Sequence, residues 1–246
     1  MKKILSLILA WLLYFSLYAQ LPDGKSILMK IDQNLVSENR FFASTMVIHG
    51  RRTAVTFKLK TWTAGTTKSF TEYLFPVREK GTKMLKLNDQ LWIYSPDADR
   101  TVQITGNMLQ QSVMGSDLSY EDLMEDSRLT DKYNAKVTGS DKIDGRNCWI
   151  IELTAFVPDV AYHGMKLWVD QERDIPLREE MYAKGGTLLK RTQLSDVQRI
   201  NERWYPKKLT VKDMLKEGMG TELIIDEIEF NLTIPDHIFT KASLKK

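Results

Sequence analysis

The sequence predicts a mainly β fold of the α+β class, in which a single antiparallel sheet is accompanied by two helical segments. Apolar and polar residues alternate with a period of two through most of the chain after residue 41. Short turn sequences separate these segments, and no stretch rich in Pro, Gly and Ser divides the chain. Because short turns join antiparallel strands whereas parallel strands need long crossovers, we expect one meandering domain of about thirteen strands.

The amino-terminal residues have the pattern of a secretory signal peptide. Two lysines precede the apolar run 4–15, and a short stretch then ends at Ala19. The run is shorter than the about 20 residues that a membrane-spanning helix needs. We expect cleavage after Ala19, which removes 1–19 and leaves 20–246 as a single exported, periplasmic domain. An uncleaved amino-terminal anchor is the alternative.

The first helical segment is predicted at 24–40, where Ile27, Ile31 and Leu35 share one face. Alternation then begins, as in Val55, Phe57 and Leu59, which are separated by polar residues. The strands predicted in this first series are 42–49, 54–62, 69–74, 83–87, 90–94 and 101–104.

After residue 104 the alternation stops, and 105–128 is predicted to be loop and helix. Four flexible or branched apolar residues lie in this otherwise polar connection, so the segment must cover an apolar surface. Asp117 or Ser119 can cap a short helix over 119–124. Strands are predicted to resume at 136–138, 147–153, 164–169, 177–182, 188–194, 208–212 and 221–230. A sheet of this length must curl, split or close, and curling around both helical segments leaves a partly capped concave apolar face.

The charge balance excludes the usual pattern of a nucleic-acid-binding protein. Lys and Arg number 35 against 32 Asp and Glu, and without Lys2 and Lys3 the first count is 33. A nucleic-acid interface would need a strong basic excess. Cys148 is the only cysteine, which excludes an internal disulfide. Since it lies in an apolar strand, we expect it to be buried.

The sequence carries no motif of an enzyme, a cofactor site or a metal site. His49, His163 and His237 lack the short spacings of zinc ligands. No Gly-x-Ser-x-Gly elbow is present. Glu179 and Glu180 are adjacent on a predicted strand, so they point to opposite faces and cannot act together as acid and base. We therefore expect no catalytic residues, no cofactor and no metal.

Several blocks of the sequence resemble a known family. These are Leu91-Trp92-Ile93-Tyr94-Ser95-Pro96, Met114-Gly115-Ser116-Asp117-Leu118-Ser119-Tyr120-Glu121-Asp122-Leu123 and Trp204-Tyr205-Pro206-Lys207. The chain is similar there, and over most of its mature length, to the outer-membrane lipoprotein-sorting protein group of the LolA-like superfamily. The resemblance implies a strongly curved, half-open antiparallel β-barrel with helices plugging the concave face. It also implies a cavity that receives acyl chains of lipoproteins or other lipids.

On this basis we expect a non-enzymatic periplasmic carrier that shuttles lipoprotein acyl chains or lipid toward the outer membrane. The residues expected to line the cavity are Val55, Phe57, Leu59, Trp149 and Ile151, and those expected in the lid are Met108, Leu109, Val113 and Met114. Each of them could instead be an ordinary core residue. The expected partners are an inner-membrane transporter and an outer-membrane acceptor, with no nucleic acid, and the carrier is expected to be a monomer.

Two other functions stay open on the sequence alone. A lipid-sensing or lipoprotein-sensing interaction module without transfer activity is the main alternative, and an enzyme is the third. Exposed aromatic residues separate a docking module from a carrier, because a large exposed apolar patch usually marks a contact surface. The aromatic residues on which this test depends are Trp62, Trp168, Tyr182 and Trp204.

Overall fold

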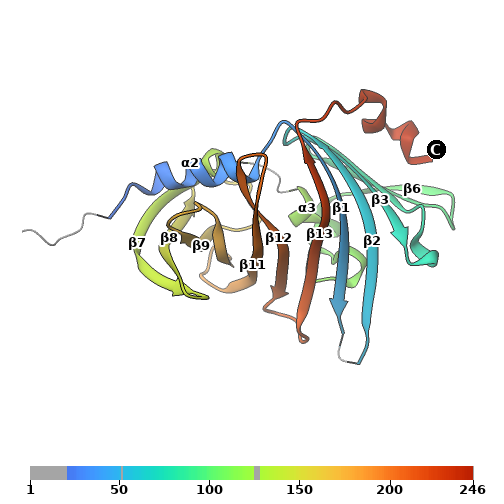
Figure 1. The fold of residues 1–246 in the computed structure, drawn as a ribbon. Coiled ribbons are helices and arrows are strands. Elements are labelled where there is room, and N and C mark those ends of the chain that lie inside the picture. The colour runs from blue at the N-terminus through green and yellow to red at the C-terminus, as the bar shows by residue number, and fades with distance from the viewer. Residues whose placement is uncertain (1–20, 51, 125–127, 246) are drawn as a thin grey trace, which may run out of the picture.

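The computed structural model describes residues 21–50, 52–124 and 128–245, and the predicted signal peptide lies outside them. In the described residues thirteen strands form one antiparallel sheet in the order β6-β5-β4-β3-β2-β1-β13-β12-β11-β10-β9-β8-β7 (Figure 1). The first six strands are β1 (Asn39–His49), β2 (Ala54–Ala64), β3 (Lys68–Phe75), β4 (Lys83–Leu87), β5 (Gln90–Ser95) and β6 (Arg100–Ile104). The others are β7 (Tyr133–Ile143), β8 (Arg146–Ala155), β9 (Gly164–Asp170), β10 (Pro176–Tyr182), β11 (Leu188–Ile200), β12 (Arg203–Asp213) and β13 (Gly220–Phe230).

The strand order divides the sheet into two meanders, β1–β6 and β7–β13, which are joined by pairing of β1 with β13. That pairing runs from Arg40 opposite Phe230 to His49 opposite Gly220. Strands β6 and β7 end the sheet and do not pair with each other in the described chain. The predicted half-open curved sheet is therefore confirmed, and each of its thirteen strands falls at a predicted place.

Helix α2 (Gly24–Leu35) plugs the concave face of the second meander, where it packs against strands β7–β9. Asp23 caps its first turn by accepting a hydrogen bond from the Ser26 backbone N–H at 2.9 Å. The helix was predicted to continue to residue 40 but ends at Leu35, because Val36 is extended. Arg40 already belongs to β1, and its Nη1 donates to the Leu35 carbonyl oxygen at 2.9 Å. That contact satisfies a carbonyl which the end of the helix leaves open.

The first meander is covered on both faces. Its convex face holds an apolar cluster that includes Phe70, Leu85 and Trp92, and the carboxy-terminal segment packs on it through Phe239 and Leu244. This segment forms two 3₁₀ helices, η5 (Asp236–Phe239) and η6 (Lys241–Lys245), at the red end of the chain in Figure 1. The sequence analysis did not predict them.

The concave face of the first meander is covered by the connection between β6 and β7. This connection contains η2 (Gly106–Gln110), η3 (Val113–Gly115), the short helix α3 (Tyr120–Met124) and η4 (Leu129–Asp131). Another 3₁₀ turn, η1 (Val77–Glu79), lies between β3 and β4. Among the described helices, none has the length and hydropathy needed to cross a bilayer.

Candidate functional site

The concave face encloses two adjoining chambers. The first has a volume of about 370 Å³ and lies between β1–β5 and the segment 113–123. The second has a volume of about 380 Å³ and lies between α2, α3 and strands β9–β12. The two share a set of lining residues, so they lie side by side. The shared residues are Arg40, Leu118, Asp122, Tyr205 and Leu209.

The wall that β2–β4 provide to the first chamber is apolar apart from hydroxyl groups, and the charged lining residues are the shared Arg40 and Asp122. Thr61 and Thr71 face each other on β2 and β3, and their hydroxyls hydrogen-bond at 3.0 Å. The Tyr73 ring is buried, and desolvation raises the pKa of its hydroxyl well above the usual range. It packs edge-to-face on Phe57, with ring centroids 6.0 Å apart. This wall therefore offers contact to an apolar ligand without exposing unsatisfied charge.

We call residues 105–124 the lid. Its central loop is closed by two backbone bonds, from Val113 N–H to the Leu118 carbonyl at 2.8 Å and from Tyr120 N–H to the Gln111 carbonyl at 3.1 Å. Gly115 turns the loop with a φ of 78°, which is in the left-handed region that favours glycine. The turn directs Val113 inward, so that it is buried against the first chamber.

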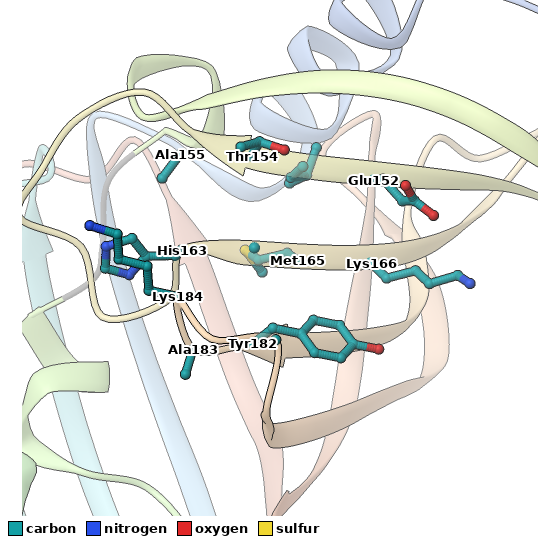
Figure 2. Close-up of a pocket in the computed structure, with 12 residues that line it drawn as sticks. Glu152, Thr154, Ala155, His163, Met165, Lys166, Tyr182, Ala183 and Lys184 are labelled. Carbon is teal, nitrogen blue, oxygen red and sulfur yellow. The ribbon is translucent and has the colours of Figure 1, made fainter.

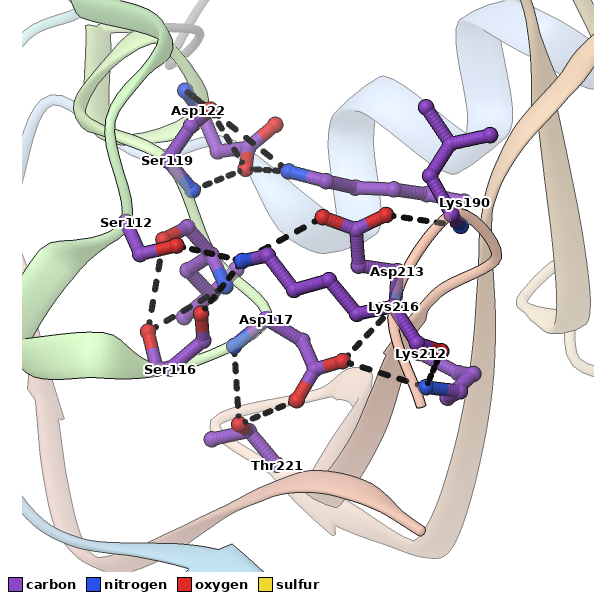
Figure 3. Close-up of polar contacts among 12 residues, drawn as sticks. Ser112, Ser116, Asp117, Ser119, Asp122, Lys190, Lys212, Asp213, Lys216 and Thr221 are labelled. Atoms are coloured by element: carbon purple, nitrogen blue, oxygen red, sulfur yellow. Dashed lines mark hydrogen bonds and ion pairs between the residues drawn. The ribbon is translucent and has the colours of Figure 1, made fainter. Parts of the chain in front are cut away.

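One set of polar contacts ties the loop of the lid to β12 and β13 (Figure 3). The Asp117 carboxylate accepts hydrogen bonds from the Thr221 hydroxyl at 2.8 Å and from the Asp213 backbone N–H at 2.9 Å. The Asp117 N–H donates in turn to the Thr221 hydroxyl at 3.0 Å. Lys216 donates to the Ser116 carbonyl at 3.1 Å. These contacts hold the lid over the cavity mainly through side chains.

A second tie joins α3 to β11 at the junction of the two chambers. Asp122 forms an ion pair with Lys190, and the two side chains are only 12% and 9% exposed. Asp122 also accepts hydrogen bonds from the Tyr162 hydroxyl and from the Ser119 backbone N–H, the latter at 2.6 Å. Desolvation, followed by the nearby charge of Asp122, raises the pKa of Tyr162 far above its usual range. Tyr162 therefore stays a hydrogen-bond donor at physiological pH.

The second chamber holds a carboxyl group of a different kind. Glu179 on β10 opposes Leu167 on β9 and Thr192 on β11, and both neighbours are buried. Desolvation by burial raises the pKa of Glu179 to about 7. The adjacent Glu180 points to the other face and forms an ion pair with Arg191 at 2.8 Å. The prediction that the two carboxyls lie on opposite faces is confirmed.

The residues predicted on β2 lie at different depths. Leu59 lines the first chamber, and Phe57 is buried in the apolar cluster beside it. Val55 is 43% exposed near the start of β2 and lines neither chamber. On β8, Ile151 is fully buried under α2, and Trp149 packs partly against the same cluster. These two contribute to the floor beneath the helix, outside the lining of both chambers.

Of the four lid residues predicted from the sequence, two lie at the first chamber and two do not. Val113 lines the first chamber, and Met114 packs against the cluster around it. Met108 and Leu109, in η2, are half-buried and line neither chamber. Six further cavity residues were not predicted from the sequence: Leu118, Asp122, Leu123, Arg40, Glu179 and Tyr205. The first three lie within the block 114–123 that carries the family resemblance, which was the available signal.

A larger hollow of about 630 Å³ lies outside this cavity, at the ends of β8–β10 (Figure 2). It is open to solvent, and Glu152, Lys166 and Lys184 are among the residues that line it. Charged side chains around an open hollow are expected of an ordinary solvated surface. We therefore take the lidded concave cavity as the candidate site.

The four aromatic residues proposed as a docking test are all at least partly buried. Trp62 packs into the convex cluster under the carboxy-terminal segment, whereas Trp168 and Trp204 belong to a cluster at the other end of the sheet. Tyr182 donates its hydroxyl to Glu180 at 2.5 Å. Cys148 is buried as predicted, and burial raises the pKa of its thiol. The described residues contain no cluster of three His, Cys, Asp or Glu that could hold a metal.

Comparisons with known proteins agree with this architecture. Residues 65–246 match the model of a protein family whose description reads "Uncharacterized protein". The chain belongs to this family. None of the curated proteins compared with it is significantly similar.

Three solved structures share the fold. A DUF1329 family protein from Desulfovibrio piger has a TM-score of 0.81 at 24% identity, covering 90% of this chain and 97% of the other. A putative outer membrane lipoprotein-sorting protein domain from Vibrio parahaemolyticus has a TM-score of 0.78 at 21% identity, with 91% and 98% covered. A LolA superfamily protein from Nitrosomonas europaea has a TM-score of 0.73 at 23% identity, with 91% and 100% covered. At these identities the similarity establishes the fold, and the fold that the resemblance to the LolA-like superfamily implied is confirmed.

Proposed function

We propose that this protein is an exported periplasmic carrier that binds the acyl chains of a lipoprotein or lipid in its two-chamber cavity and shuttles them toward the outer membrane. The observation that carries the proposal is the pair of adjoining chambers under a lid that is tied down mainly by side chains. Each buried CH₂ group of an acyl chain contributes about 0.8 kcal/mol. Burial in such a cavity is therefore sufficient for carriage, and no catalytic residue is needed.

The lid gives the cavity a means of loading and release. Leu118 and Leu123 line the first chamber from the lid side, so displacement of the lid opens that chamber. The contacts that must break are hydrogen bonds and ion pairs, which water can replace once they are exposed. A lipid surface or partner that competes for these contacts would open the lid without unfolding the sheet. An inner-membrane transporter and an outer-membrane acceptor are the partners that this role requires.

The first experiment is native mass spectrometry of the protein purified from a bacterial periplasm without detergent, followed by lipid extraction. A bound phospholipid, fatty acid or acylated peptide supports the carrier and identifies the cargo class. A homogeneous protein that stays empty after incubation with acylated peptide and lipid vesicles contradicts it. Transfer between donor and acceptor vesicles is measured next, since binding without transfer favours the sensing module.

Two matched substitutions in the lid connect the binding to the cavity. Val113→Asp places a charge against the first chamber and should lower lipid affinity by about tenfold or more while the sheet stays folded. Met108→Asp changes a lid residue that lines neither chamber and should leave affinity within about twofold. If both variants bind lipid as tightly as the wild type, the lid has no part in lipid binding.

A further inference from the structure

Glu179 places an ionisable group on the inner wall of a cavity that is otherwise suited to apolar chains. Its neighbours across the sheet, Leu167 and Thr192, are 0% and 4% exposed, whereas Glu179 itself is half-buried on the wall of the chamber. The Glu179 side chain lines the second chamber and makes no hydrogen bond or ion pair with any described residue. It is therefore available to a group that enters the chamber.

The other charged groups that face this chamber have partners within the protein. On α2, Asp32 accepts hydrogen bonds from the backbone N–H groups of Leu129 at 2.9 Å and Thr130 at 3.1 Å, and from the Thr130 hydroxyl at 2.7 Å. Arg40 on β1 donates to the Leu35 carbonyl and to the Thr63 hydroxyl.

The remaining charged residues on the wall are Asp122 on α3 and Lys190 on β11, which pair with each other. Three negative and two positive groups thus line the chamber when all are ionised, and of the three carboxylates only Glu179 has no hydrogen-bond or ion-pair partner among the described residues. The tyrosines on the wall, Tyr133, Tyr162 and Tyr205, add no charge while their hydroxyls are protonated.

An unpaired carboxylate in such a place is unfavourable without a ligand, because burial penalises the charged form. This penalty is the reason that the pKa of Glu179 is raised to about 7. A cation that entered the chamber would remove the penalty by forming a charge-assisted hydrogen bond. An alcohol or ester head would leave the charge unmatched.

We propose that Glu179 is the head-group site of the cavity, and that it binds the protonated amine of an amphiphile whose apolar chain extends past Leu118 and Leu209 into the first chamber. This inference rests on the proposed lipid-binding function and adds the chemistry of the ligand head. It assigns polar selectivity to the second chamber and chain burial mainly to the first.

The test compares two probes with the same chain, decylamine and 1-decanol, by isothermal titration calorimetry below their aggregation concentrations at pH 8. At this pH Glu179 is largely ionised and the amine is protonated, since alkylamines titrate near pH 10 as lysine does. The protein is first freed of copurified lipid. We expect the wild type to bind the amine roughly 10- to 100-fold more tightly than the alcohol, as for a hydrogen bond between charged groups.

Glu179→Gln keeps the size of the side chain and removes its charge, so this variant should bind decylamine and 1-decanol with about equal affinity. Glu180→Gln is the matched control, because Glu180 lies on the opposite face and should leave the preference unchanged. If the wild type binds both probes equally, or Glu179→Gln keeps the preference, the head-group site is wrong while lipid binding stands. If neither probe binds the wild type, both proposals are overturned.

Discussion

The two chambers of the concave face accommodate polar side chains on their walls in different ways. In the first chamber, polar side chains such as Thr61 and Thr71 satisfy each other, and the charged lining residues, Arg40 and Asp122, are those it shares with the second chamber. In the second chamber, Asp122 and Lys190 form a buried ion pair, Asp32 accepts hydrogen bonds, and Glu179 has no partner among the described residues. One continuous sheet thus provides a neutral compartment, whose own wall carries no charge beyond the shared residues, and a charged one with ionisable residues of its own. The comparison indicates that cavity shape alone does not determine what the protein can bind.

The buried ion pair provides the largest expected effect. Lys190→Met leaves Asp122 as an uncompensated buried charge and should lower the free energy of unfolding by roughly 3–5 kcal/mol, measured by urea denaturation. Adding Asp122→Asn should recover at least half of this loss, because the amide retains an acceptor for the Ser119 N–H. Lys208→Met is the control, since it breaks a surface pair with Glu222 and should cost less than about 1 kcal/mol. If Lys190→Met and Lys208→Met lower the free energy of unfolding equally, the Asp122–Lys190 pair in the second chamber behaves like an exposed surface pair.

The second effect is a pH dependence that only the charged chamber should show. The pKa of Glu179 rises from about 4.5 to about 7 on folding, so the folded state holds its proton more tightly. The proton on Glu179 therefore contributes to the free energy of unfolding. This contribution is fully present below pH 4.5, declines as the pH rises to 7 and is absent above that, a change of up to about 3 kcal/mol. Unfolding of the wild type and Glu179→Gln should therefore diverge across this window, with the variant gaining relative stability. Parallel curves would mean that Glu179 is solvated.

The sequence was sufficient to predict the strands because alternation is local information. The period of two is clear in β2, where Phe57, Leu59, Thr61 and Thr63 are buried on one face and the residues between them are more exposed. Strand β7 was predicted at 136–138 but spans Tyr133–Ile143. Its second half is polar and is ordered by pairing with β8 through a turn in which Asp144 and Gly145 both have positive φ. Such pairing depends on the partner strand and is weakly encoded in hydrophobicity.

The cavity was predicted less completely because its decisive contacts join distant parts of the chain. Asp122 meets Lys190 across 68 residues, and Asp117 meets Thr221 across 104. The sequence showed that adjacent Glu179 and Glu180 face opposite ways, but which of them faces inward depends on the curvature of the sheet. Apolar composition predicted that this segment covers an apolar surface, yet its polar residues make the contacts that position it.

A smaller effect is expected from the lid, which both chambers share. Gly115→Val places a β-branched residue at a φ of 78° and should cost about 1–2 kcal/mol by urea denaturation, with faster lipid exchange from both chambers. The control is Gly185→Val, at an open turn position with no neighbouring atom within 4 Å of an added Cβ. If the two variants behave alike, the left-handed turn in the lid has no special role.

The smallest effect tests the neutral compartment. Thr61→Val removes one partner of the hydroxyl pair and leaves the Thr71 hydroxyl buried, which should cost about 1–2 kcal/mol at every pH. Replacing both threonines with valine should cost less than the single change, because no unsatisfied hydroxyl then remains. Both variants should retain the amine preference that we assign to Glu179. A pH-dependent loss in Thr61→Val, or a loss of the amine preference, would show that charge in the second chamber is sensed across the whole cavity and that the two compartments act as one.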